Sequence, residues 1–92
     1  MLTLERLFEV LRERRAHPTP NSYTARLLEE GLPRIAQKVG EEATEVVVAA
    51  LAQDDHRLTE EIADLTYHVL VLMLARGLTL ADIAAELERR HR

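Results

Sequence analysis

The chain has 92 residues, a formal net charge of −4, no cysteine and three aromatic residues. This length accommodates a single domain, residues 1–92, and the lack of cysteine excludes disulfides, thiolate metal sites and cysteine nucleophiles. The negative charge argues against a nucleic-acid partner. Because the composition favours Ala, Leu, Glu and Arg, all good helix formers, we expect an all-α fold.

Capping residues and helical periodicity divide the chain into a bundle of about four to five helices. We predict helices over about residues 4–16, 22–30, 33–53, 56–76 and 80–90. Thr3, Ser22 and Thr79 are the predicted N-caps, and Gly31 and Gly77 are the predicted C-terminal stops. Two prolines between residues 17 and 21 separate the first two helices, because proline cannot continue a helix.

The two central helices each carry an unbroken apolar run, Val46 to Ala52 and Val69 to Ala75. A helix that is apolar on all sides needs burial on all sides, and one small bundle hardly provides this twice. Gly40 in the first of them predicts either close packing of another backbone or a break. We therefore expect a homodimer or higher oligomer in which both helices form a shared core.

Neither apolar run approaches the length of a membrane span. Residues 1–6 also lack the apolar stretch of a signal peptide. We therefore expect no membrane partner and a cytoplasmic location.

Acidic residues crowd the first half of each central helix. On the first, a 100° step per residue places on one strip the side chains of Arg34, Lys38, Glu41 and Glu45, with Glu42 at its shoulder. On the second, Glu61 and Asp64 share a face with His68. Carboxylates three or four residues apart can share one ion, and Mg²⁺ prefers oxygen ligands. Two such helices side by side predict a Mg²⁺ site that bridges phosphate oxygens.

Two other interpretations of the acidic pattern remain beside this one. The carboxylates can form a solvated helix face with basic partners. A di-iron site is disfavoured, because it needs Glu-x-x-His on two helices, whereas His68 follows Asp64 by four residues. The other histidines are expected at the surface: His17, His56 and His91.

Glu41-Glu42-x-x-Glu45 followed by Glu61-x-x-Asp64 resembles the signature of the MazG-like all-α nucleoside-triphosphate pyrophosphohydrolases. Within this superfamily, Ser22-Tyr23-Thr24 and Tyr67-His68 are similar to the phosphoribosyl-ATP pyrophosphohydrolase family. The resemblance covers nearly the whole chain. It implies Mg²⁺-dependent hydrolysis of 1-(5-phosphoribosyl)-ATP to 1-(5-phosphoribosyl)-AMP and pyrophosphate, the second step of histidine biosynthesis.

The motif assigns roles to particular side chains. The predicted metal ligands are Glu42, Glu45, Glu61 and Asp64. Glu41 is either a further ligand or the base that orients the attacking water, and Lys38 is the predicted catalytic cation. The predicted substrate-binding residues are Ser22, Tyr23, Thr24, Arg34, Lys38 and His68. Arg34 and Gln37 stand where the family often has Lys, and only Arg34 keeps the charge.

Two alternative functions compete with this one. The first keeps the chemistry and changes the substrate, as in a house-cleaning pyrophosphohydrolase of non-standard nucleotides. The second is a non-catalytic helical dimerisation module in which the acidic residues are a solvated face.

Overall fold

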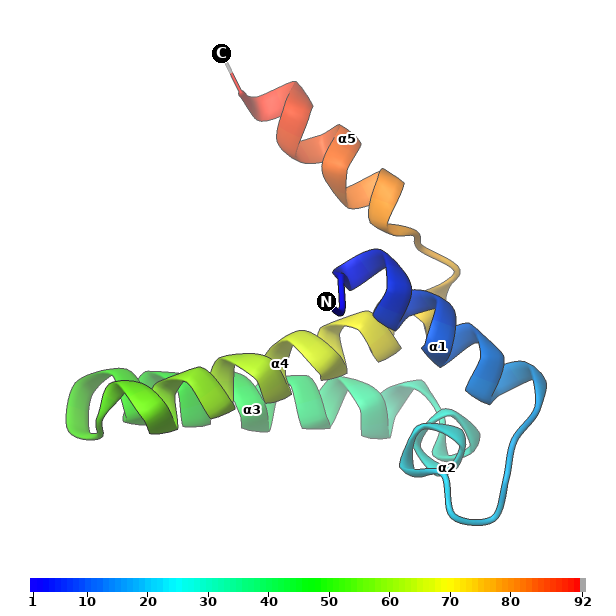
Figure 1. Cartoon of the computed structure of the whole chain (residues 1–92), viewed down its shortest axis with the longest axis horizontal. Coiled ribbons are helices and arrows are strands. Elements are labelled where there is room, and N and C mark those ends of the chain that lie inside the picture. Colours follow the sequence, from blue (N-terminus) through cyan, green and yellow to red (C-terminus); the bar gives the residue numbers. More distant parts are fainter. Residues whose placement is uncertain (92) are drawn as a thin grey trace.

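The computed structural model describes residues 1–91, which form five helices and contain no strand (Figure 1). The helices are α1 (Leu4–Ala16), α2 (Tyr23–Glu30), α3 (Leu32–Ala52), α4 (Asp55–Arg76) and α5 (Leu80–Arg90). The predicted all-α fold class is therefore confirmed. The single domain over residues 1–92 stays a prediction, and its last residue, Arg92, lies outside the described residues.

Short-range caps set the helix ends close to where the sequence predicts them. The Thr3 hydroxyl accepts the Arg6 N–H, and the Ser22 hydroxyl accepts the Ala25 N–H. At the end of α4, Gly77 adopts a left-handed conformation with φ of 75°, which only glycine takes without strain. The one clear shift is at α3 and α4, which begin one residue earlier than predicted.

Helices α3 and α4 form a long antiparallel hairpin, and α1 and α2 pack against the end where α3 begins and α4 finishes (Figure 1). The hydrophobic core lies at that end. Its buried members are Phe8, Leu11, Leu27, Ile35, Leu70, Val71, Met73 and Leu74. In the other half of the hairpin, residues 43–65, only Ala49 and Glu61 are buried.

The two apolar runs have different surroundings. In Val69–Ala75, four residues are buried in the core and two more are partly buried. Helices α1 and α2 cover this run within one chain. In Val46–Ala52, by contrast, Ala49 is buried, whereas Val47 is 57% exposed and Leu51 is 84% exposed.

Helix α3 is continuous through Gly40, so the predicted alternative of a break there is wrong. A Cβ at Gly40 would meet no atom within 4 Å. At 100° per residue, six exposed residues lie within about 40° of the direction opposite to buried Ala49. These residues form the outer stripe of α3: Pro33, Ala36, Gly40, Thr44, Val47 and Leu51. Its one polar side chain, Thr44, donates its hydroxyl to the backbone oxygen of Gly40, and the stripe is uncovered within one chain.

Helix α5 projects away from the rest of the chain (Figure 1). It has no buried residue, and only Leu80 at its start packs against the core. Its apolar side chains Ile83 and Leu87 are exposed. Over residues 1–91, no single helix is long and apolar enough to cross a membrane, and only α4 and α5 taken together, across a 105° bend, reach that length and composition.

Candidate active site

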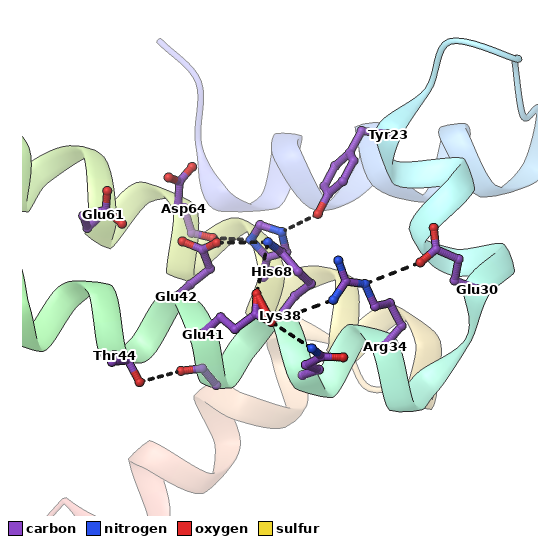
Figure 2. A network of polar contacts seen from close by, with 12 residues as sticks. Tyr23, Glu30, Arg34, Lys38, Glu41, Glu42, Thr44, Glu61, Asp64 and His68 are labelled. Atoms are coloured by element: carbon purple, nitrogen blue, oxygen red, sulfur yellow. Dashed lines mark hydrogen bonds and ion pairs between the residues drawn. The ribbon is translucent and has the colours of Figure 1, made fainter.

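Three carboxylates from α3 and α4 meet on one side of the hairpin (Figure 2). Ligand oxygens of Glu42, Glu61 and Asp64 all lie within 4.8 Å of one another. The i, i+3 spacing puts Glu61 and Asp64 on the same side of α4, and Glu42 reaches them from α3. They line an open cavity of about 400 Å³, the acidic cavity, together with Lys38, Glu41, Glu45 and Arg57.

Two cations offset the crowded negative charge. Lys38 Nζ lies 3.4 Å from Glu42 Oε1 and 3.7 Å from Glu41 Oε1. Arg57 Nη2 lies 2.7 Å from Glu61 Oε1. Because Glu61 is only 3% exposed, its charge needs such a partner. Arg57 is not among the predicted site residues, although its i, i+4 spacing to Glu61 indicates this pair.

The pKa of Lys38 is raised above its ordinary value. Burial is the largest influence and lowers the pKa, but the hydrogen bond to Glu42 and the charges of Tyr23, Glu42 and Glu41 together outweigh it. Lys38 is therefore a fixed positive charge at neutral pH. It lies half-buried beside the three carboxylates, where it is able to donate to a ligand oxygen.

The residues of the predicted acidic strip have different positions relative to the cavity. Glu45 lines the cavity but is not one of the three close carboxylates. Glu41 accepts a hydrogen bond from Gln37 Nε2 at 3.0 Å. Arg34 lies between Glu30, at 3.5 Å from its Nε, and Glu41, at 3.8 Å from its Nη1. The uncharged Gln37 thus holds Glu41 in place at the rim.

His68 connects the carboxylates to α2 (Figure 2). Its Nδ1 lies 2.7 Å from the backbone oxygen of Asp64, and its Nε2 lies 3.0 Å from the Tyr23 hydroxyl. Since a carbonyl oxygen only accepts, Nδ1 carries the proton and Nε2 accepts from the Tyr23 O–H. Both ring nitrogens of this buried histidine are therefore engaged within the chain.

Ser22 and Thr24, which flank Tyr23 in the sequence, are buried at the start of α2. The Thr24 hydroxyl forms a hydrogen bond with the Tyr67 hydroxyl. Burial raises the pKa of Tyr67, although the bond to Thr24 works in the opposite direction. The Tyr67 ring packs edge-on to His68, with centroids 5.0 Å apart. Tyr67 therefore contacts two of the predicted site residues, His68 and Thr24, although it is not itself among the predicted site residues.

The histidines predicted at the surface are exposed: His17, His56 and His91. Among residues 1–91, the group of side chains that could hold a metal ion consists of three carboxylates and contains no histidine. It therefore offers only oxygen atoms as ligands.

The chain matches the family model described as phosphoribosyl-ATP pyrophosphohydrolase over residues 4–91. The chain belongs to the phosphoribosyl-ATP pyrophosphohydrolase family. The resemblance inferred from the motifs is thus confirmed, and the match to this family spans all five helices, including both acidic segments.

Curated relatives agree with this assignment. A protein of Pyrobaculum calidifontis named phosphoribosyl-ATP pyrophosphatase is 59% identical, over 95% of this chain and 93% of that protein. One of Lacticaseibacillus casei with the same name is 54% identical, over 91% of this chain and 76% of that protein. A bifunctional histidine biosynthesis protein of Gloeobacter violaceus is 51% identical, over 98% of this chain and 40% of that protein. These names describe the family as one of hydrolases.

Proposed function

We propose that this chain hydrolyses 1-(5-phosphoribosyl)-ATP to 1-(5-phosphoribosyl)-AMP and pyrophosphate, a step of histidine biosynthesis. The observation that carries the proposal is the meeting of Glu42, Glu61 and Asp64 in a chain of this family. A solvated acidic face does not require carboxylates from two helices to converge, since like charges at such distances repel.

The three close carboxylates suit Mg²⁺. They offer only oxygen atoms, which are the ligands that Mg²⁺ prefers, and they leave coordination positions for water and phosphate. Glu42, Glu61 and Asp64 would hold the ion, with Glu45 as a further ligand from the same cavity. A bound Mg²⁺ would neutralise charge on the phosphate oxygens.

The remaining side chains of the cavity act on the substrate and on water. Glu41 lies at the rim, where it orients the attacking water as a base or serves as another ligand. Lys38 donates to a phosphate oxygen as a compact charge, and Arg34 adds a second cation nearby. Arg57 pairs with Glu61 and holds its carboxylate in place. Tyr23, Ser22 and Thr24 form the substrate side at the start of α2, and His68 positions the Tyr23 hydroxyl.

The substrate proposal is tested by turnover of phosphoribosyl-ATP against a panel of deoxynucleoside triphosphates at fixed free Mg²⁺. We expect kcat/KM for phosphoribosyl-ATP to exceed that for each deoxynucleotide by about two orders of magnitude or more, which is the discrimination that buried polar groups provide. Pyrophosphate release measures the rate. A reversed preference would favour a house-cleaning pyrophosphohydrolase instead.

Lys38→Met removes the charge and keeps much of the apolar stem. We expect kcat/KM to fall by about ten-fold or more, equal to about 1.4 kcal/mol of transition-state stabilisation, because an oriented cation stabilises charge on the transferring group. Steady-state kinetics at fixed free Mg²⁺ measure this. An unchanged kcat/KM would show that Lys38 only screens Glu41 and Glu42.

We also propose that the protein is a homodimer built on the outer stripe of α3. Large apolar side chains of the stripe are exposed within one chain, and so are Ile83 and Leu87 of the projecting α5. Gly40 lowers the helix propensity of α3 by about 1 kcal/mol relative to Ala, and nothing within the chain approaches it. Close packing of a second copy on Gly40 explains why α3 has a glycine at this position.

A further inference from the structure

A second cavity lies between α1 and the start of α2, outside the acidic cavity, and three of the proposed substrate-binding residues, Ser22, Tyr23 and Thr24, line it. This α1–α2 cavity has a volume of about 320 Å³, near the lower end of the roughly 300–1,000 Å³ typical of ligand pockets. Its polar lining consists of Arg14, Asn21, Ser22, Tyr23, Thr24 and Tyr67. Arg14 is the only charged residue among the residues that line it.

Arg14 is one of five arginines without a carboxylate partner among the described residues, with Arg12, Arg15, Arg26 and Arg76, and it is the only one of the five that lines the α1–α2 cavity. Arg6, Arg34 and Arg57 each lie within 4.0 Å of a carboxylate. Over residues 1–91, by contrast, no carboxylate lies within that distance of Arg14. An uncompensated guanidinium beside hydroxyl donors is suited to a phosphate, which it binds through two parallel hydrogen bonds.

The Ser22 hydroxyl of the cavity is able to donate to an anionic ligand. Ser22 Oγ accepts the Ala25 N–H, which leaves its O–H able to donate. Arg14 also lies close enough to Tyr67 for its charge to lower the pKa of that phenol, although burial outweighs this effect. Arg14, Ser22 and Tyr67 thus line one and the same cavity.

The two cavities are neighbours along α4. Asp64 lines the acidic cavity and Tyr67 lines the α1–α2 cavity. Asp64 and Tyr67 are three positions apart on α4, which corresponds to an axial rise of about 4.5 Å. Tyr23 also lines the second cavity, and its hydroxyl bonds His68 beside the carboxylates. One cavity carries excess negative charge and suits a metal-bound polyphosphate, whereas the other carries a single positive charge.

We infer that the α1–α2 cavity is the subsite for the phosphomonoester of the substrate's added ribose, with Arg14 as its main ligand. This inference rests on the proposed function. Phosphoribosyl-ATP carries a triphosphate and, on its second ribose, a separate 5-phosphate, so it has two anionic groups for two adjacent cavities. A simple nucleoside triphosphate lacks the second group. Arg14 is therefore a specificity-determining residue that binds the part of the substrate remote from the hydrolysed bond.

Arg14→Gln tests the subsite, with Arg12→Gln as the matched control. Arg12 is on the same helix and lies over the Phe8 ring, away from this cavity. For Arg14→Gln we expect KM for phosphoribosyl-ATP to rise about ten-fold or more with kcat within about two-fold, because the lost contact is made equally in the ground and transition states. Calorimetry should show the same loss for the product phosphoribosyl-AMP and no loss for AMP.

Arg14→Lys keeps the charge and removes the two-point geometry, so its KM should lie between those of the wild type and Arg14→Gln. Melting curves establish whether each variant is folded. If Arg14→Gln does not fold, the KM of Arg14→Lys decides the question. Unchanged KM in these variants, or equal weakening of AMP and phosphoribosyl-AMP, would overturn the subsite. Failure of the wild type to hydrolyse phosphoribosyl-ATP would instead overturn the proposed function.

Discussion

Asp64→Asn is expected to lower kcat by about three orders of magnitude, or about 4 kcal/mol of transition-state stabilisation, because it removes an anionic ligand of the proposed ion. Asp64 is exposed and belongs to the group of three carboxylates that lie within 4.8 Å of one another. The free energy of unfolding should stay level or rise slightly, since the substitution removes the repulsion of Asp64 by the other two carboxylates of the group. Pyrophosphate release at saturating Mg²⁺ measures the rate, and chemical denaturation measures the stability.

Glu60→Gln is the control for this variant. Glu60 lies on the same helix and pairs with Arg57 and His56, but it does not line the acidic cavity. Its kcat should stay within about two-fold of the wild type, because a surface ion pair contributes at most about 1 kcal/mol. If Asp64→Asn retained the wild-type kcat, Asp64 would not be a ligand. If calorimetry showed no saturable Mg²⁺ site in the wild type, the non-catalytic helical module would be the better interpretation.

Val47→Asp combined with Leu51→Asp is expected to convert the protein to monomers or to unfold it. Both side chains lie on the outer stripe of α3, and a dimer built there would desolvate four new carboxylates at several kcal/mol in total. Light scattering should give the wild type twice the 10.5 kDa mass of one chain. The double variant should give a single-chain mass or lose its helical circular dichroism.

Two further variants sharpen the assembly test. Leu2→Asp also replaces an exposed leucine, but it precedes α1 and should leave the mass unchanged. Gly40→Leu should change the free energy of unfolding in opposite directions for a monomer and for a dimer. In a monomer the new side chain meets open space and raises stability through helix propensity by about 1 kcal/mol. In a dimer it separates the packed helices and lowers stability. A wild-type monomer at micromolar concentration would contradict the proposal directly.

The sequence by itself determined the helices and their ends. Ser22, Thr79 and Gly77 act through hydrogen bonds and backbone conformations within a few residues, so their effects are readable without knowledge of packing. The same is true of the spacing that puts Glu61 and Asp64 on one side of α4, because helical geometry alone fixes it. The family motifs added the proposed chemistry.

Which side chains meet was decided by the tertiary structure. Helical angles place Glu41 and Glu45 on the strip and Glu42 at its shoulder, yet it is Glu42 that joins the two acidic residues of α4. The reason is that α4 packs against the side of α3 that carries Glu42 and Ala49, a choice that depends on the whole core. Periodicity gives angles within one helix, but it does not say where the neighbouring helix lies.

The surroundings of Tyr23 and of the two apolar runs were likewise decided by the tertiary structure. Periodicity does not reveal that α2 folds back until Tyr23 reaches His68, 45 residues further along the chain. Nor does it reveal that α1 and α2 cover Val69–Ala75 and leave the outer stripe of α3 open. Local propensities act over a few residues, whereas burial and ion-pair partners depend on contacts between segments that are remote in sequence, and only the packed structure specifies these.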